Sequence, residues 1–266
     1  MSVFSLQQGR VPLLISLPHV GTEIPPELQD HFVPRALASE DTDWHLERLY
    51  RPLAETLGAS LIVPRYSRYV IDLNRPPDDA PLYPGASGGT GLVPTRFFTN
   101  EPLYRDGHEP DAAAIAARRE AYWRPYHEAL AAEMTRLRAV HGRALIFEGH
   151  SIRSELPWLF EGRLPALNLG TADGASSAPG ITSALAAVLA GHTAHDHVVN
   201  GRFKGGYITR HFGRPAEGWH AVQLEMCQRC YMDEDADPRQ AWDDARAAEV
   251  SPLLEALLGR LLACPV

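Results

Sequence analysis

The chain has 266 residues, of which 45% are hydrophobic and 22% charged, a composition that is typical of folded globular proteins and excludes a disordered or fibrous chain. This length supports a large core, and α/β proteins of this size commonly form one domain, so we expect a single domain over residues 1–266. The formal charge of -8 and the lack of a long basic run exclude a nucleic-acid-binding surface.

The first half of the chain predicts a strand, a helix and two more strands. Residues 11–18 are a short apolar run typical of a strand covered on both faces, and His19 follows it directly. Residues 41–57 have the apolar spacing of an amphipathic helix, with Asp43 at or just inside its start. Further strands are expected at 59–65 and 68–74.

A long irregular stretch and a helix come next. Residues 76–110 are rich in Pro and Gly, and loops of this length in compact domains are commonly functional, so a lid is one hypothesis for it. Residues 111–140 are Ala-rich and periodic, which predicts a long helix bent near Pro125.

The second half continues the alternation of strands and helices. The apolar run 143–151 predicts another buried strand, and His150 lies at its end. After it we expect a helix at 180–191, a segment at 197–203 that leads into a turn at Gly205 and Gly206, an alternating strand at 220–227, and an amphipathic helix over about the last 25 residues. This order predicts an α/β fold with a largely parallel or mixed sheet, whose ligands bind beyond the carboxyl ends of the strands.

Three side chains that can bind a metal fall at these predicted ends. His19 and His150 each follow a buried strand, and Asp43 starts a helix between them. Two neutral imidazoles and one carboxylate leave a fourth position for water, which is the pattern of a catalytic zinc site. The alternative for each histidine alone is a hydrogen-bonded residue of the core or its rim.

Several longer motifs carry a family resemblance. The segments PHVGTEIP, DTDW, SRYVIDLNRPPDD, GLVPTRFF, EGHSIRS, GGYITRHFG and QLEMCQR together resemble the N-formylglutamate amidohydrolase family, also called N-formylglutamate deformylase, from about residue 10 to the C-terminal helix. The resemblance implies hydrolysis of N-formyl-L-glutamate to formate and L-glutamate, the last step of a histidine degradation pathway. It also implies a three-layer α/β/α sandwich with a central mixed sheet, similar to the zinc-dependent exopeptidases.

The resemblance also implies the roles of individual residues. The metal ligands of the family fall on His19, Asp43 and His150, with Asp41 and Glu23 as alternatives for the third ligand. Zinc is the expected ion, although two histidines and a carboxylate also accept cobalt, manganese or iron. The general base of the exopeptidase-like arrangement falls on Glu225; if its side chain points outward instead, it is a solvated strand residue.

The substrate has two carboxylates, which arginine forks receive well. Only Lys204 of the 25 basic residues is a lysine, so arginines are the natural candidates. The expected substrate-binding residues are Arg68, Asn74, Arg75, Arg153 and Arg210, with an ordinary surface position as the alternative for each arginine. His127 is a further candidate as an oxyanion donor, with helix packing as its alternative.

Other interpretations of the sequence stay open. A deacylase for another N-acyl acidic amino acid, or a protein that binds an acidic ligand without turnover, would use the same groups. The N-terminal segment lacks the pattern of a signal peptide and no run has the length of a membrane span, so we expect a cytoplasmic protein without a membrane partner. The sequence predicts no particular oligomeric state. Cys227 and Cys230 form one CxxC without a second, and we expect them to be structural.

Overall fold

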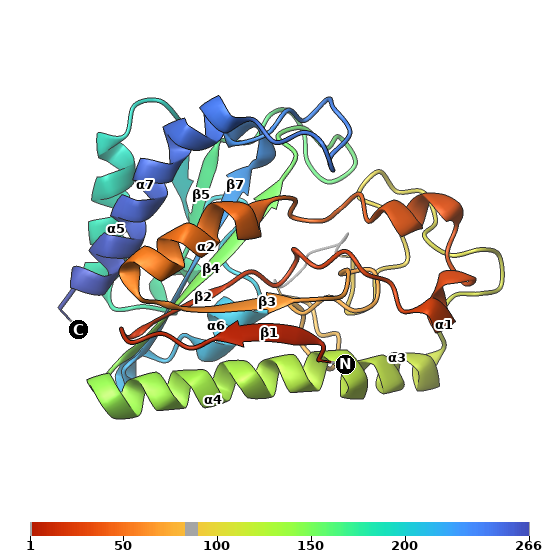
Figure 1. The fold of residues 1–266 in the computed structure, drawn as a ribbon, viewed down its shortest axis with the longest axis horizontal. Helices are drawn as coiled ribbons and strands as arrows, with labels where there is room; N and C mark the ends of the chain where they lie inside the picture. The colour runs from red at the N-terminus through yellow and green to blue at the C-terminus, as the bar shows by residue number, and fades with distance from the viewer. Residues whose placement is uncertain (1, 83–89, 266) are drawn as a thin grey trace.

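A seven-stranded mixed sheet forms the centre of the computed structural model, which describes residues 2–82 and 90–265 (Figure 1). The strand order is β1-β3-β2-β4-β7-β5-β6, and β3, β2, β4 and β7 run parallel to one another. β1 and β5 are antiparallel to their neighbours β3 and β7. The strands are β1 (Phe4–Gln7), β2 (Leu13–Ser16), β3 (Ser60–Pro64), β4 (Ala144–Ile152), β5 (Leu167–Gly170), β6 (His197–Val199) and β7 (Trp219–Cys227).

Helices cover both faces of the sheet, and this makes the expected three layers (Figure 1). The longer ones are α2 (Leu46–Leu57), α3 (Ala112–Arg118), α4 (Arg124–His141), α5 (Pro179–Gly191), α6 (Tyr207–Phe212) and α7 (Asp244–Ala263). The short α1 (Pro26–Gln29), 3₁₀ turns at Pro34–Ala38, Ala172–Gly174, Pro215–Glu217 and Gln228–Cys230, and a π-helical turn at Arg119–Trp123 complete the described helices. The predicted α/β class with a mixed sheet is therefore confirmed.

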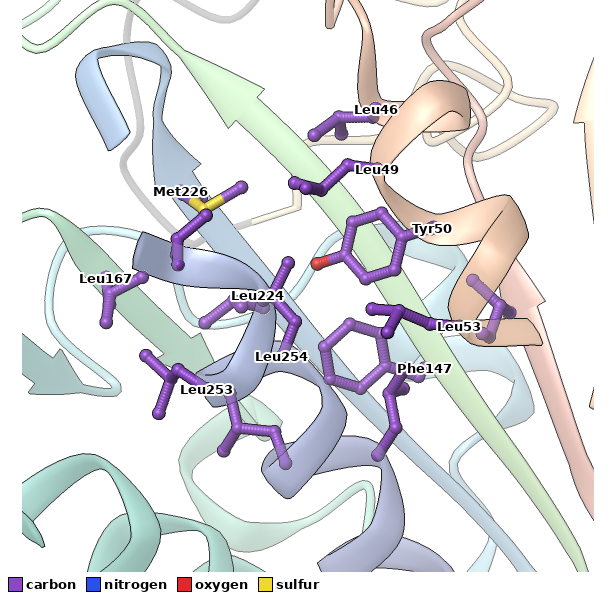
Figure 2. Close-up of a cluster of buried hydrophobic side chains, with 14 of the residues drawn as sticks. Leu46, Leu49, Tyr50, Leu53, Phe147, Leu167, Leu224, Met226, Leu253 and Leu254 are labelled. Atoms are coloured by element: carbon purple, nitrogen blue, oxygen red, sulfur yellow. The ribbon is translucent and has the colours of Figure 1, made fainter. Parts of the chain in front are cut away.

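The helices α2, α5 and α7 pack on one face of the sheet, where the larger hydrophobic core lies. Figure 2 shows Tyr50 of α2 and Leu253 and Leu254 of α7 gathered around Phe147 and Leu224 of the central strands. Gly149 of β4 faces this core, and a Cβ on it would lie 2.7 Å from a methyl group of Leu17. The residue before His150 therefore has to be glycine for β4 to lie this close to the core.

The opposite face is covered by α4 and α6 and carries the second core cluster. On this face β4 and β7 present, beside apolar residues, Glu148, His150, Gln223 and Glu225, since side chains two apart on a strand point the same way. All nine residues of each of these two strands are buried. Polar groups buried here need partners, so this face is where a site is expected.

Three predicted elements differ in the structure. The helix expected at 41–57 begins only at Leu46, after His45 in a left-handed conformation with φ of 62°. Asp43 lies three residues before this start because its carboxylate accepts hydrogen bonds from β4 instead of capping the helix. The helix expected at 111–140 is interrupted at Arg119–Trp123 by a π-helical turn just before Pro125. The C-terminal helix, expected over about the last 25 residues, is shorter and covers only Asp244–Ala263.

The prediction of a strand at 68–74 is wrong. This segment is a buried series of turns, in which Val70 N–H donates to the Ser67 carbonyl and Asp72 N–H donates to the Leu92 carbonyl. Arg68, Asp72 and Asn74 interrupt the apolar residues of this segment. Their bonds inside the protein hold the segment in turns instead of a regular strand. The two edge strands β1 and β6 and the short β5 were not predicted.

The Pro- and Gly-rich stretch 76–110 contains no helix or named strand over its described residues 76–82 and 90–110, as expected. The part of the predicted lid at 83–89 lies outside the described residues. None of the described helices combines the length and apolar character required to cross a membrane.

Candidate metal centre

His19, Asp43 and His150 converge at the carboxyl ends of β2 and β4. Each offers one ligand atom, and these three atoms lie within 4.8 Å of one another. All three side chains are buried, and Asp43 Oδ2 lies 3.9 Å from His19 Nδ1 and 3.1 Å from His150 Nδ1. Within residues 2–82 and 90–265, this is the one group of three or more His, Cys, Asp or Glu side chains spaced to hold an ion.

Backbone bonds hold the three residues in place. Asp43 N–H donates to the His19 carbonyl at 3.0 Å, which fixes the loop before α2 against the end of β2. The carboxylate of Asp43 also accepts the Ser151 N–H at 3.1 Å. The segment that carries Asp43 is therefore tied to both strands that deliver the histidines.

A buried carboxylate lies behind His19. Its Nε2 is 2.7 Å from Asp72 Oδ1, and Asp72 Oδ2 accepts a hydrogen bond from Arg68 Nη2 at 2.6 Å. Burial lowers the pKa of His19, and the positive charge of Arg68 lowers it further. Burial alone would raise the pKa of Asp72, but His19 and Arg68 outweigh it and hold that pKa well below its usual range. A neutral His19 thus donates through Nε2–H and keeps the lone pair of Nδ1 for a metal.

His150 has a similar arrangement with Glu148. Its Nε2 lies 2.7 Å from Glu148 Oε1, while its Nδ1 faces Asp43. Burial disfavours a charge on His150, but Glu148, Asp43 and Glu225 together hold its pKa well above the usual range. A metal at Nδ1 would therefore displace a proton.

The donor set suits a divalent metal ion. Two imidazole Nδ1 atoms and a carboxylate oxygen face one point, and a buried carboxylate backs each imidazole, which is the common support for metal-binding histidines. These donor atoms could therefore hold a metal ion. The two histidines and Asp43 lie together as the sequence predicted.

The two alternative third ligands have other partners. Asp41 Oδ2 accepts from the Tyr69 hydroxyl at 2.8 Å and from Phe98 N–H at 3.0 Å. Glu23 is half exposed and forms an ion pair with Arg65 at 2.8 Å. Asp43 is therefore the carboxylate best placed beside the histidines.

Glu225 lies next to His150 across the β4–β7 pair, in direct register. Its side chain points inward, with 8% of the residue exposed. Burial, together with the negative charges of Asp43 and Glu148, raises the pKa of Glu225 to about 8. A nearby cation would favour its ionised form, so this carboxyl group can exchange a proton near neutral pH.

The candidate substrate residues fall into two groups. Arg68 is buried, its Nη2 bonds Asp72, and its Nε has no hydrogen-bond partner. Arg75 is one-quarter exposed and its Nε lies 3.9 Å from the same Asp72 carboxylate. Arg153 is exposed and pairs with the exposed Asp235 at 3.5 Å, and Arg210 of α6 donates to the Gly205 carbonyl. The structure thus brings Arg68 and Arg75 together near His19.

Asn74 is bound within the protein at four atoms. Its N–H donates to Asp72, its carbonyl accepts from Tyr207 N–H, its Oδ1 accepts from Ile208 N–H and its Nδ2 lies 3.0 Å from His150 Nε2. It therefore connects the surroundings of both histidines to α6.

His127 and the CxxC cysteines have packing roles. His127 Nε2 donates to the Leu73 carbonyl at 2.8 Å, its ring stacks on Trp123, and burial lowers its pKa to about 3. Cys227 and Cys230 are buried and unpaired, and burial raises the pKa of both thiols to about 12. Inert buried thiols agree with the structural expectation.

Sequence reasoning did not identify Asp72 and Glu148 as part of this site. Glu148 had a usable signal, because it lies two residues before His150 on a predicted strand and therefore on the same face. Asp72 had none, because it approaches His19 through a segment of turns.

Known proteins resemble this chain over nearly its whole length. The family model described as N-formylglutamate amidohydrolase matches residues 11–232. A Pseudomonas aeruginosa protein named N-formylglutamate deformylase is 51% identical, and one of the same name from Pseudomonas putida is 49% identical; both comparisons cover 96% of each chain. The crystal structure of N-formylglutamate amidohydrolase from Ralstonia eutropha JMP134 has the same fold, with a TM-score of 0.81 at 23% identity over 98% of both chains. This chain belongs to the N-formylglutamate amidohydrolase family.

Proposed function

We propose that this protein hydrolyses N-formyl-L-glutamate to formate and L-glutamate. The observation that carries the proposal is the 51% identity to a protein named N-formylglutamate deformylase over 96% of both chains. The buried cluster of two histidines with the carboxyl groups of Asp43 and Glu225 is a suitable site for the hydrolysis of an amide bond. The protein would act as one domain over residues 1–266, and its place would be the cytoplasm. The reaction would be the last step of histidine degradation.

The ion proposed for the site is zinc, held by His19 Nδ1, His150 Nδ1 and Asp43. Two histidines and one carboxylate are a common ligand set of catalytic zinc. When bound, such an ion would lower the pKa of a water molecule to about 7 and polarise a carbonyl group. Asp72 and Glu148 support the arrangement because they accept hydrogen bonds from the far nitrogens of the two imidazoles.

Glu225 is the proposed general base. It takes a proton from the attacking water as the water oxygen bonds to the formyl carbon. It then gives that proton to the amide nitrogen as the bond between carbon and nitrogen breaks, so that formate and the free amine of glutamate leave. The buried position beside His150 and the pKa of about 8 support this role.

The carboxylates of the substrate require positive partners, and Arg75 is the best placed of the proposed residues. It is partly exposed and close to Asp72, which bonds to His19. Arg68 carries a further buried positive charge and an unused Nε–H at the same place. Arg210 is part of α6, and Asn74 bonds to the start of that helix. Arg153 lies on the surface, so we expect it to contribute less to substrate binding.

The test is formate release by the purified protein from N-formyl-L-glutamate, beside N-acetyl-L-glutamate and N-formyl-L-alanine. We expect the first substrate to be preferred, because it matches both the small acyl group and the second carboxylate. A preference for the acetyl compound would indicate a deacylase instead. Tight binding of N-formyl-L-glutamate without formate release would indicate a binding protein.

A further inference from the structure

We propose that Glu148 and Thr209 form a positioning pair that holds a proton on Nε2 of His150, so that the proton which a metal displaces is the one on Nδ1, beside Asp43. The inference rests on the proposed metal site, in which Glu148 already supports His150, and adds Thr209 of α6 as the residue that holds Glu148 in place. Neither residue is a ligand candidate or contacts the reacting atoms in the proposal above.

The two oxygens of Glu148 have separate partners. Oε1 lies 2.7 Å from His150 Nε2, and Oε2 accepts two hydrogen bonds from Thr209, one from its hydroxyl at 2.5 Å and one from its N–H at 3.1 Å. Both residues are fully buried. Because Thr209 holds Oε2 from two directions, the carboxylate cannot rotate away from the imidazole.

The start of α6 is itself fixed against the site, so Thr209 has a defined position. Asn74 accepts the N–H groups of Tyr207 and Ile208, and Gln223 accepts the N–H of Gly206 at 2.8 Å. A Cβ at Gly206 would lie 2.2 Å from Asn74 Nδ2, so only glycine allows this approach. The GGYIT segment is thereby placed so that its threonine reaches Glu148.

Asn74 offers a competing partner for His150. Its Nδ2 lies 3.0 Å from the same Nε2, and its Oδ1 is occupied by Ile208 N–H, so the amide can only donate in this direction. If it donated to Nε2, the proton of a neutral ring would lie on Nδ1 and block a metal there. Glu148 is the closer partner, and a carboxylate accepts only, so Nε2 carries the proton and donates to Glu148.

The pair on His150 differs from its counterpart on His19. Asp72 is bound by the cation Arg68, whereas Glu148 is bound by the neutral donors of Thr209. The negative charge of Glu148 therefore stays available to His150, which makes the imidazole a stronger electron donor. Loss of Glu148 or of the Thr209 hydroxyl should accordingly lower the affinity for the metal without removing a ligand.

Four variants test the pair through metal affinity, measured by competition of Zn²⁺ with a chromophoric chelator. Thr209→Val removes the hydroxyl and should weaken zinc binding about three- to tenfold, whereas Thr209→Ser keeps the hydroxyl and should restore the affinity. Glu148→Gln should weaken binding about 10- to 100-fold. Thr182→Val, on α5 across the sheet, is the matched control and should leave affinity unchanged. Thermal unfolding of each variant identifies any that fail to fold.

The side-chain nitrogens of His150, observed by NMR in ¹⁵N-histidine-labelled protein, give a second readout that does not need the metal. We expect a downfield, slowly exchanging proton on Nε2 in the wild type and in Thr209→Ser, and faster exchange of that proton in Thr209→Val. If wild-type protein binds no zinc, the metal proposal fails, but this proton still tests the pair. A His150 Nε2 without a proton, or folded Thr209→Val and Glu148→Gln proteins with wild-type zinc affinity and proton exchange, would overturn the inference.

Discussion

Replacement of Glu225 by glutamine changes catalysis and stability in opposite directions. The glutamine keeps the shape of the side chain but cannot accept a proton. Loss of a general base typically costs about 100- to 10,000-fold in rate, so kcat for N-formyl-L-glutamate should fall by that amount. Zinc should remain bound, because Glu225 is not one of the proposed ligands.

The stability effect follows from the pKa of the same carboxyl group. Its ordinary pKa is 4.5 and burial raises it to about 8 in the fold, so above pH 4.5 the unfolded chain loses a proton that the folded protein keeps. The resulting penalty is absent below pH 4.5, grows by about 1.4 kcal/mol per pH unit, and is complete above pH 8. At pH 7 it is on the order of 3 kcal/mol, so metal-free Glu225→Gln should unfold about 5–10 °C above the metal-free wild type.

The assay combines kcat from formate release, zinc content, and Tm of the metal-free protein at pH 5 and pH 7. Glu217→Gln, an exposed carboxylate just before β7, is the control and should change none of these. Turnover of Glu225→Gln near the wild-type rate would remove Glu225 as the base. A lower Tm at pH 7 would show that the fold favours its ionised form, against the reasoning above.

Three further changes test other parts of the site. His150→Ala removes a proposed ligand and should lose most bound zinc, while the control variant His192→Ala, at the end of α5, should keep it; full zinc occupancy in His150→Ala would contradict the ligand assignment. Arg75→Ala should raise KM about 10- to 100-fold, as expected for a lost charge-assisted hydrogen bond, with a smaller effect for Arg153→Ala; equal effects would contradict the ranking. The pKa of His127 is lowered to about 3 in the fold, so its contribution to stability is complete above pH 6.5 and falls by up to about 1.4 kcal/mol per pH unit below that value. His127→Gln should therefore flatten the decline of Tm between pH 6.5 and pH 4, and an unchanged slope would refute this.

The sequence predicted best where one physical requirement dominates. β2 and β4 are covered on both faces, so their apolar runs alone identify them, and the alternation of residues 220–227 identifies β7. Their ends give the positions of His19 and His150 along the chain. The two histidines meet because β2 and β4 are parallel neighbours in the sheet, a pairing that the apolar runs alone do not specify.

The prediction failed where polar side chains determine the backbone. Residues 68–74 have the apolar residues of a strand, but Asp72 and Asn74 bond to His19 and His150 from distant parts of the chain, which propensity cannot reveal. The late start of α2 has a similar cause, since Asp43 bonds to Ser151 on β4 instead of capping its own helix. β1, with its partly exposed FSLQ sequence, lies at the edge of the sheet and has little hydrophobic signal.

The central claim is that His19, Asp43 and His150 hold a metal ion that hydrolysis of N-formyl-L-glutamate requires. The most direct measurement is formate release by the same protein sample as purified, after removal of metal with a chelator, and after return of one equivalent of zinc. We expect activity to fall with the metal content and to return with zinc. Full activity in protein shown to be free of metal would contradict the claim.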